Sequence, residues 1–365
     1  MVTLGVEEEY LLLDPDSGLP LPRGALVRAA AEPAPAADGG EIDLELLQAQ
    51  VEVGTPICET LDEVDEHLTR LRAAVHDAAR KMDCRLAACG TPPLLAPEPV
   101  PVTAKPRYRS MAHDAAHLVD EQLVNGMHVH VAIPDRDSGV TVLNRLRPWL
   151  PVLVALGANS PLWDGAETGF ASWRTLIFGR WPVSGPPPPF ADAADYRHRT
   201  QALLDAGVIA DRGQLYWQAR LSERYPTIEV RALDVQLEIQ DAVTLAGVVR
   251  ALVSTALHDQ GRALPRAEPE HSHPELLAAA VWYAARHGLT ERLVHPLTGR
   301  SVPAPEAVAS LMEHLTPALE ASGDLARVTR GIERLQNVGT GSVRQTRALR
   351  EGGTAAVLEL ITVRS

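Results

Sequence analysis

Acidic residues with the spacing of a β-strand open the chain, at Glu7 and Glu9. They alternate with Val6 and Tyr10, so in a strand both carboxylates would lie on one face, roughly 7 Å apart. Glu8 has the opposite parity and is expected to lie outside any site formed there. Neighbouring carboxylates resist ionising together unless a cation joins them, and such oxygen ligands hold Mg2+ together with substrate phosphates. An edge strand with a solvated acidic face is the alternative.

Three other strand-like segments also carry polar side chains on one face. They are His128 with His130, Glu229 with Arg231, and Glu52 among valines. If these faces line one sheet surface, they form a cavity of carboxylates, imidazoles and a guanidinium. Carboxylates with one or two imidazoles suit Mg2+ or Mn2+, whereas zinc more often recruits Cys or three His. An arginine beside them can grip a phosphate with two hydrogen bonds.

Two further motifs have competing interpretations. His113 and His117 lie four residues apart on a helix predicted over 110–123, which resembles a zinc-peptidase pattern. That pattern needs Glu where Asp114 stands, and two histidines on an amphipathic helix are the alternative. The segment from Gly339 to Gly341 precedes the last predicted helix and could bind an anion at its N-terminus, or could be a plain loop and cap.

The elements that must position these residues are a mixture of strands and helices. Strands are predicted over 50–53, 85–89, 126–131 and 227–235. Thr60 and Glu63 form a capping box before a helical apolar stripe that runs to Met82. From about residue 240 onward the pattern is mostly helical, and Ser342 with Gln345 is predicted to cap the last helix. This order predicts an α+β fold, with residues 1–365 as one domain.

Composition narrows the class of protein. The 365-residue chain carries a net charge of −13, which argues against nucleic-acid binding because that function needs a basic footprint. No run of 18 consecutive apolar residues occurs, so no membrane-spanning helix is predicted. Three cysteines form no CxxC pair and are expected to be reduced, in a cytoplasmic protein.

Five motifs in chain order then define a resemblance. They are Gly5 to Tyr10, Leu46 to Glu52 with Thr55-Pro56, Gly126 to Val131, Ala158 to Pro161, and Thr227 to Arg231. This ordered set resembles the YbdK-type carboxylate–amine ligases, a family often named glutamate–cysteine ligase type 2. The Trp181-Pro182 loop and the segment from Gly339 to Gly341 also look like that family. Each motif is weak alone, but together they span residues 4 to about 345.

The resemblance implies a glutamine-synthetase-like catalytic fold. Its curved, mainly antiparallel sheet has a concave active-site face that binds ATP and Mg2+ or Mn2+, with helices packed behind. By similarity, Glu7, His128 and Glu229 would hold one cation, and Glu9, Glu52 and Glu45 would hold others. Arg231 would contact the nucleotide phosphates, and Arg174 would meet the phosphoryl group or the substrate carboxylate. His130, on the same strand face, would support these ligands or contact the bound cofactor or substrate.

The implied reaction is ATP-dependent amide formation between a small carboxylic acid and an amine, through an acyl phosphate. Weak γ-glutamylcysteine synthesis is part of that expectation, and a homodimer is a further one. Asn125 replaces the Cys common in this family, and Phe170 and Trp173 replace Tyr, which puts glutamate and cysteine in doubt as substrates. An amide hydrolase or deamidase on the same fold and a non-catalytic nucleotide-binding protein are the alternatives.

Overall fold

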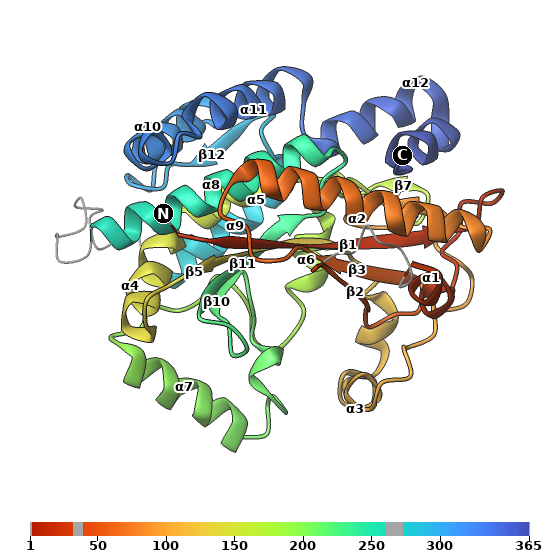
Figure 1. Ribbon diagram of the computed structural model, residues 1–365, viewed down its shortest axis with the longest axis horizontal. Coiled ribbons are helices and arrows are strands. Elements are labelled where there is room, and N and C mark those ends of the chain that lie inside the picture. The colour runs from red at the N-terminus through yellow and green to blue at the C-terminus, as the bar shows by residue number, and fades with distance from the viewer. Residues whose placement is uncertain (1, 32–38, 260–272, 365) are drawn as a thin grey trace.

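A seven-stranded antiparallel sheet forms the centre of the computed structural model, which describes residues 2–31, 39–259 and 273–364 (Figure 1). The strand order is β10-β11-β5-β1-β3-β2, and β4 also pairs with β1. The strands are β1 (Leu4–Leu13), β2 (Glu41–Leu44), β3 (Gln50–Gly54), β4 (Arg85–Ala87), β5 (Gly126–Ala132), β10 (Ala219–Leu221) and β11 (Thr227–Asp234). Helices pack on this sheet, which confirms the predicted α+β class.

The register of the sheet aligns the polar residues in rows. Glu7 lies opposite His128, and Glu9 lies opposite Glu52. On the other side of β5, His130 lies opposite Glu229. Because side chains alternate between faces, these residues share one face of four adjacent strands.

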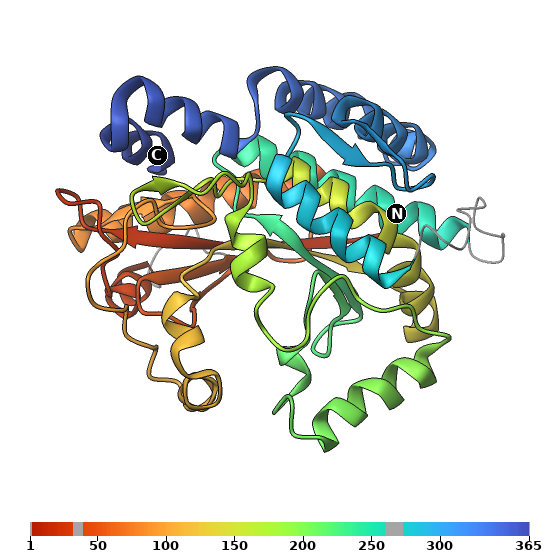
Figure 2. The same ribbon diagram turned by 180° about the vertical axis from the view of Figure 1, so that it is seen from behind.

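The other face of the sheet is apolar and is covered by helices. Val129, Val131 and Val230 are fully buried in a core cluster that also contains residues of α4, α5 and α8. Figures 1 and 2 show the long helices above the sheet, whereas α3 and α7 project below it at opposite ends. The helices are α1 (Gly24–Ala31), α2 (Leu61–Lys81), α3 (Pro106–Ala115), α4 (Arg136–Leu146), α5 (Leu150–Leu156), α6 (Trp173–Phe178), α7 (Ala193–Asp205), α8 (Ile239–His258), α9 (Pro274–His287), α10 (Ala304–Ser322), α11 (Leu325–Val338) and α12 (Gly341–Ile361).

Short elements complete the fold. Three two-stranded pairs join β6 (Leu162–Trp163) to β7 (Ala166–Glu167), β8 (Ser184–Gly185) to β9 (Tyr216–Trp217), and β12 (Arg292–Val294) to β13 (Ser301–Pro303). Among the described residues, α8 alone is long and apolar enough to cross a membrane, and 78% of its apolar window is buried inside the protein. This burial is typical of a helix in the core of a protein.

Helix boundaries follow local capping chemistry in one predicted case and depart from it in two. The Thr60 hydroxyl accepts a hydrogen bond from the Glu63 N–H at 3.2 Å, which confirms the start of α2. The helix predicted over 110–123 instead breaks at Ala116, whose φ of 48° ends α3 and begins a 3-10 turn. The predicted capping box of Ser342 is also wrong, because α12 begins at Gly341 and the Ser342 N–H bonds to the carbonyl of Ala158.

Candidate active site

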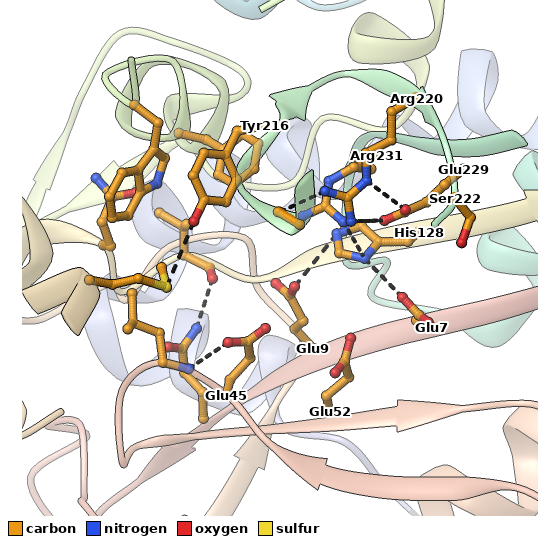
Figure 3. Close-up of a pocket in the computed structure, with 18 of the residues that line it drawn as sticks. Glu7, Glu9, Glu45, Glu52, His128, Tyr216, Arg220, Ser222, Glu229 and Arg231 are labelled. Atoms are coloured by element: carbon orange, nitrogen blue, oxygen red, sulfur yellow. Dashed lines mark hydrogen bonds and ion pairs between the residues drawn. The ribbon is translucent and has the colours of Figure 1, made fainter. Parts of the chain in front are cut away.

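The polar face of the sheet lines a cavity of about 520 Å³ (Figure 3). We call it the acidic cavity. Strands β1, β3, β5 and β11 form its floor, because their polar residues share that face. Every residue predicted for the site lines it: Glu7, Glu9, Glu45, Glu52, His128, His130, Arg174, Glu229 and Arg231.

Glu7 is held between two imidazoles of the neighbouring strand β5. Its carboxylate lies 3.1 Å from His128 Nδ1 and 3.3 Å from His130 Nε2. Burial opposes ionisation of Glu7, but the hydrogen bonds and charges of the two histidines outweigh it and hold its pKa below the ordinary value. Burial and the nearby Arg231 lower the pKa of His128, so this imidazole is neutral near pH 7.

Glu9, Glu45 and Glu52 form an acidic cluster on the β3 side of the cavity (Figure 3). Burial and the charge of Glu9 raise the pKa of Glu45 to about 7. Burial and the charges of the surrounding glutamates raise the pKa of Glu52 well above its ordinary value. The protein itself therefore leaves this cluster short of positive charge.

Glu229 binds the two arginines, Arg220 and Arg231, that form the basic wall of the acidic cavity. Arg220 donates two hydrogen bonds to its carboxylate, from Nε at 2.7 Å and from Nη2 at 3.0 Å. Arg231 also donates to Glu229. Burial alone would raise the pKa of Glu229, but the two guanidinium charges keep it well below its ordinary value. The carboxylate is therefore ionised and fixes both arginines at the cavity wall.

Arg174 reaches the cavity from the first turn of α6 and is only 2% exposed. Its backbone N–H donates to the Ser160 hydroxyl, which in turn donates to Asp234. The guanidinium lies against Gly126, where an added Cβ would come within 2.1 Å of Arg174 Nη2. Among the described residues, its closest carboxylate oxygen, on Asp234, is 4.0 Å away, so the charge is only partly compensated.

Two functional neighbours were missed from the sequence. Arg220 alternates with buried Ala219 and Leu221, a strand signal that could have found it. Asp234 could not be found by parity, because the register of β11 shifts between Val230 and Leu233. Because of this bulge, the Asp234 side chain faces Ser160 and the Arg174 guanidinium instead of the apolar core.

The donor set fits hard divalent cations. Three groups bring one ligand atom from each member within 4.8 Å of the others: Glu7, Glu52 and His128; Glu7, His130 and Glu229; and Glu9, Glu45 and Glu52. In the described part of the chain, the buried Nε2 atoms of His128 and His130 form no hydrogen bond of good geometry, although each lies near a carboxylate, Glu9 at 3.6 Å and Glu7 at 3.3 Å. Carboxylate oxygens with imidazole nitrogens suit Mg2+ or Mn2+. The groups differ from the partition implied by the resemblance, since His130 rather than His128 accompanies Glu229.

The alternative histidine pair does not form a site. Ala116 interrupts the helix between His113 and His117, so the two side chains do not share one helical face. His117 lies 3.0 Å from Asp120, with its side chain 80% exposed. Neither histidine belongs to a metal-compatible group among the described residues.

Comparison with solved structures identifies the fold that the sheet and its helices form. The chain aligns with the glutamate–cysteine ligase of Francisella tularensis, solved in complex with AMP, at a TM-score of 0.73 and 13% identity, over 99% of this chain and 87% of that one. It also aligns with a bifunctional glutathione synthetase from Pasteurella multocida at a TM-score of 0.71 and 16% identity, over 98% of this chain and 51% of that one. The fold is therefore that of glutamate–cysteine ligases.

Sequence comparison then identifies the family. The model of glutamate–cysteine ligase family 2 matches residues 3–359, and the chain belongs to that family. A relative from Mycobacterium sp. (strain KMS), named "Putative glutamate--cysteine ligase 2-2", is 42% identical over 97% of this chain and 95% of its own length. A relative of the same type from Rhodopirellula baltica is 40% identical over 94% of this chain and 92% of its own length.

Proposed function

We propose that this protein is an ATP- and divalent-cation-dependent carboxylate–amine ligase that works through an acyl phosphate. The observation that carries the proposal is the convergence, in one cavity, of the metal-compatible carboxylates with the buried Arg174 and the half-buried Arg231. Family membership supports the same chemistry. The reaction would proceed without an enzyme nucleophile, and the three buried cysteines have no role in it.

The chain's own residues would position and neutralise the reacting groups. Glu7, Glu9, Glu45, Glu52, His128, His130 and Glu229 would hold the cations, in the groups that their geometry allows. When bound, the cations supply positive charge to the transferring phosphoryl group. Arg231 would contact the phosphate oxygens, and Arg174 would hold the substrate carboxylate that attacks the γ-phosphorus. Both guanidinium groups are fixed in advance by Glu229 and the Asp234 network, so little reorganisation is needed.

Bond making and breaking follow from this arrangement. A carboxylate oxygen of the acid attacks the γ-phosphorus, and ADP leaves with the bridging oxygen. The amine nitrogen then attacks the acyl carbon, inorganic phosphate leaves, and the nitrogen loses a proton. The cytoplasmic location, which buried free thiols suit, and the homodimer remain proposals of the same kind.

An ADP-release assay across pairs of acids and amines tests the function. We expect release in the presence of Mg2+ or Mn2+ to require both an acid and an amine, and Glu7→Gln and Glu229→Gln to abolish it. Amide cleavage without net consumption of ATP would instead indicate a hydrolase or deamidase. ATP binding without turnover on any pair would indicate a non-catalytic nucleotide-binding protein.

A further inference from the structure

A second, smaller cavity of about 200 Å³ adjoins the acidic cavity, and we call it the side chamber. The two share Arg174, Phe178 and Arg231 as lining residues, so the arginines stand at their junction. Phe178 lies over both, with its ring centroid 5.1 Å from Arg174 Cζ and 5.7 Å from Arg231 Cζ. Apart from the arginines the chamber is mainly apolar, and its main walls are Leu176, Phe178, Pro186, Ala278, Val281 and Trp282.

Charge at the junction favours a carboxylate. Within the described residues, the Nε atoms of Arg174 and Arg231 are buried without hydrogen-bond partners. Arg231 is already paired with Glu229, whereas no carboxylate oxygen of the described residues lies closer than 4.0 Å to Arg174. A substrate carboxylate would satisfy this guanidinium and would sit beside the phosphate-binding wall of the acidic cavity.

The chamber itself selects against a charged substituent. None of the described side chains that line it is acidic, so an ammonium group in the chamber would lie near two guanidinium charges with no carboxylate among those lining side chains. Trp282 forms part of the chamber wall and packs edge-to-face against Phe170, with ring centroids 5.4 Å apart. An apolar cavity of about 150 Å³ suffices to bind benzene, so this chamber can hold one aromatic ring or a branched aliphatic group.

Resting on the proposed ligase function, we infer that the acid substrate is a monocarboxylic acid with an uncharged, mainly apolar substituent. Its carboxylate would bind Arg174 at the junction, and its substituent would fill the side chamber. The buried Oε1 of Gln218, which also lines the chamber, has no partner among the described residues and would accept one hydroxyl or N–H of that substituent. An acid with an α-ammonium group, such as glutamate, would be disfavoured.

Hydroxylamine as a minimal amine allows the acid site to be tested alone, because it converts any acyl phosphate into a hydroxamate, which forms a coloured complex with added Fe(III). With ATP and Mg2+, we expect kcat/KM for phenylacetate or 3-methylbutanoate to exceed that for glutamate by at least about tenfold. Ala278→Trp would fill the chamber from an exposed position of α9 and should cut kcat/KM for phenylacetate about tenfold or more, while acetate is little affected.

Ala279→Trp is the matched control, since Ala279 is also exposed on α9 but does not line the chamber. ATP affinity, measured by calorimetry, should be the same in both variants. A preference for glutamate, with equal activities of the two variants on every acid, would overturn the chamber assignment and leave the ligase function intact. Absence of hydroxamate with every acid would overturn the ligase function, and the chamber assignment with it.

Discussion

Consecutive glutamates of β1 lie in opposite environments. Glu8 is fully buried on the helix-covered face, where Arg72 of α2 donates to both carboxylate oxygens, from Nε at 2.9 Å and from Nη2 at 2.5 Å. The hydroxyl of Tyr10 donates to it as well. Glu7 and Glu9 lie on the other face, in a cavity whose lining contains more carboxylates than arginines.

The two faces differ in whether the protein itself satisfies the carboxylates. We call the Glu8 face the closed side and the cavity face of Glu7 and Glu9 the open side. The Arg72 guanidinium also donates to the carbonyls of Gln236 and Leu237, so the Glu8 network is complete within the protein. On the cavity face, the pKa values of Glu45 and Glu52 are raised because burial and neighbouring carboxylates oppose their ionisation. A bound cation would stabilise the ionised form of these carboxyl groups. Such shifted pKa values are typical of a binding site rather than of a structural core.

The largest expected effect comes from breaking the open side. Glu52→Gln removes one carboxylate shared by two of the metal-compatible groups, and we expect acid-dependent ADP release to fall about 10³-fold, or about 4 kcal/mol. The unfolding free energy of the metal-free protein should stay equal or rise, because burial and neighbouring carboxylates disfavour ionised Glu52 and glutamine carries no charge. ADP-release kinetics and urea unfolding measure the two quantities. Activity within tenfold of the parent would show that Glu52 is not a ligand.

Breaking the closed side should give the reverse pattern. Arg72→Ala leaves Glu8 buried and unpaired, so we expect a loss of about 3 to 5 kcal/mol in unfolding free energy, measured by urea denaturation. The folded fraction should retain its activity. The double variant Glu8→Gln with Arg72→Met should recover part of the loss, since neither group is then charged. A loss below about 1 kcal/mol would mean that water or other groups satisfy Glu8.

Much of this contrast could be read from the sequence, because strand parity is a local property. The two-residue period places Glu7 and Glu9 on one face and Glu8 on the other, without knowledge of any partner. The rows on the other strands follow from the same period. The start of α2 was equally accessible, because its cap depends on Thr60 and Glu63 alone.

What escaped the sequence depends on distant contacts or on broken periods. Arg72 is 64 positions from Glu8, and nothing in its own helix marks it as the partner of a buried carboxylate. The bulge in β11 changes the parity before Asp234, so a continuous alternation misplaces that residue. The break at Ala116 has no Gly or Pro to announce it. Such features are decided by tertiary packing rather than by local pattern.

A smaller effect is expected at Arg174, whose guanidinium lies against Gly126 of β5. Gly126→Ala would bring a Cβ within 2.1 Å of Arg174 Nη2 and must displace the guanidinium. We expect kcat/KM to fall about 10- to 100-fold, as for other displacements of about 1 Å in a catalytic group. Gly5→Ala is the matched control, because its Cβ would meet nothing closer than 3.9 Å. Equal losses in both variants would remove Arg174 from the mechanism.

The smallest expected effect is a pH-dependent stabilisation by Mg2+ on the open side. The Glu45 pKa is about 7 in the folded protein and near 4.5 in the unfolded chain, so the folded state retains a proton that the unfolded chain loses between these values. Stability without metal therefore falls as pH rises through this window, and the fall is complete above about pH 7. A cation takes the place of that proton, so the Mg2+-induced increase in Tm should grow by about 2 °C from pH 5.5 to 7.5 and then level off. Glu45→Gln should flatten this dependence, and an increment that does not change with pH in the parent protein would place the cation away from the acidic cluster.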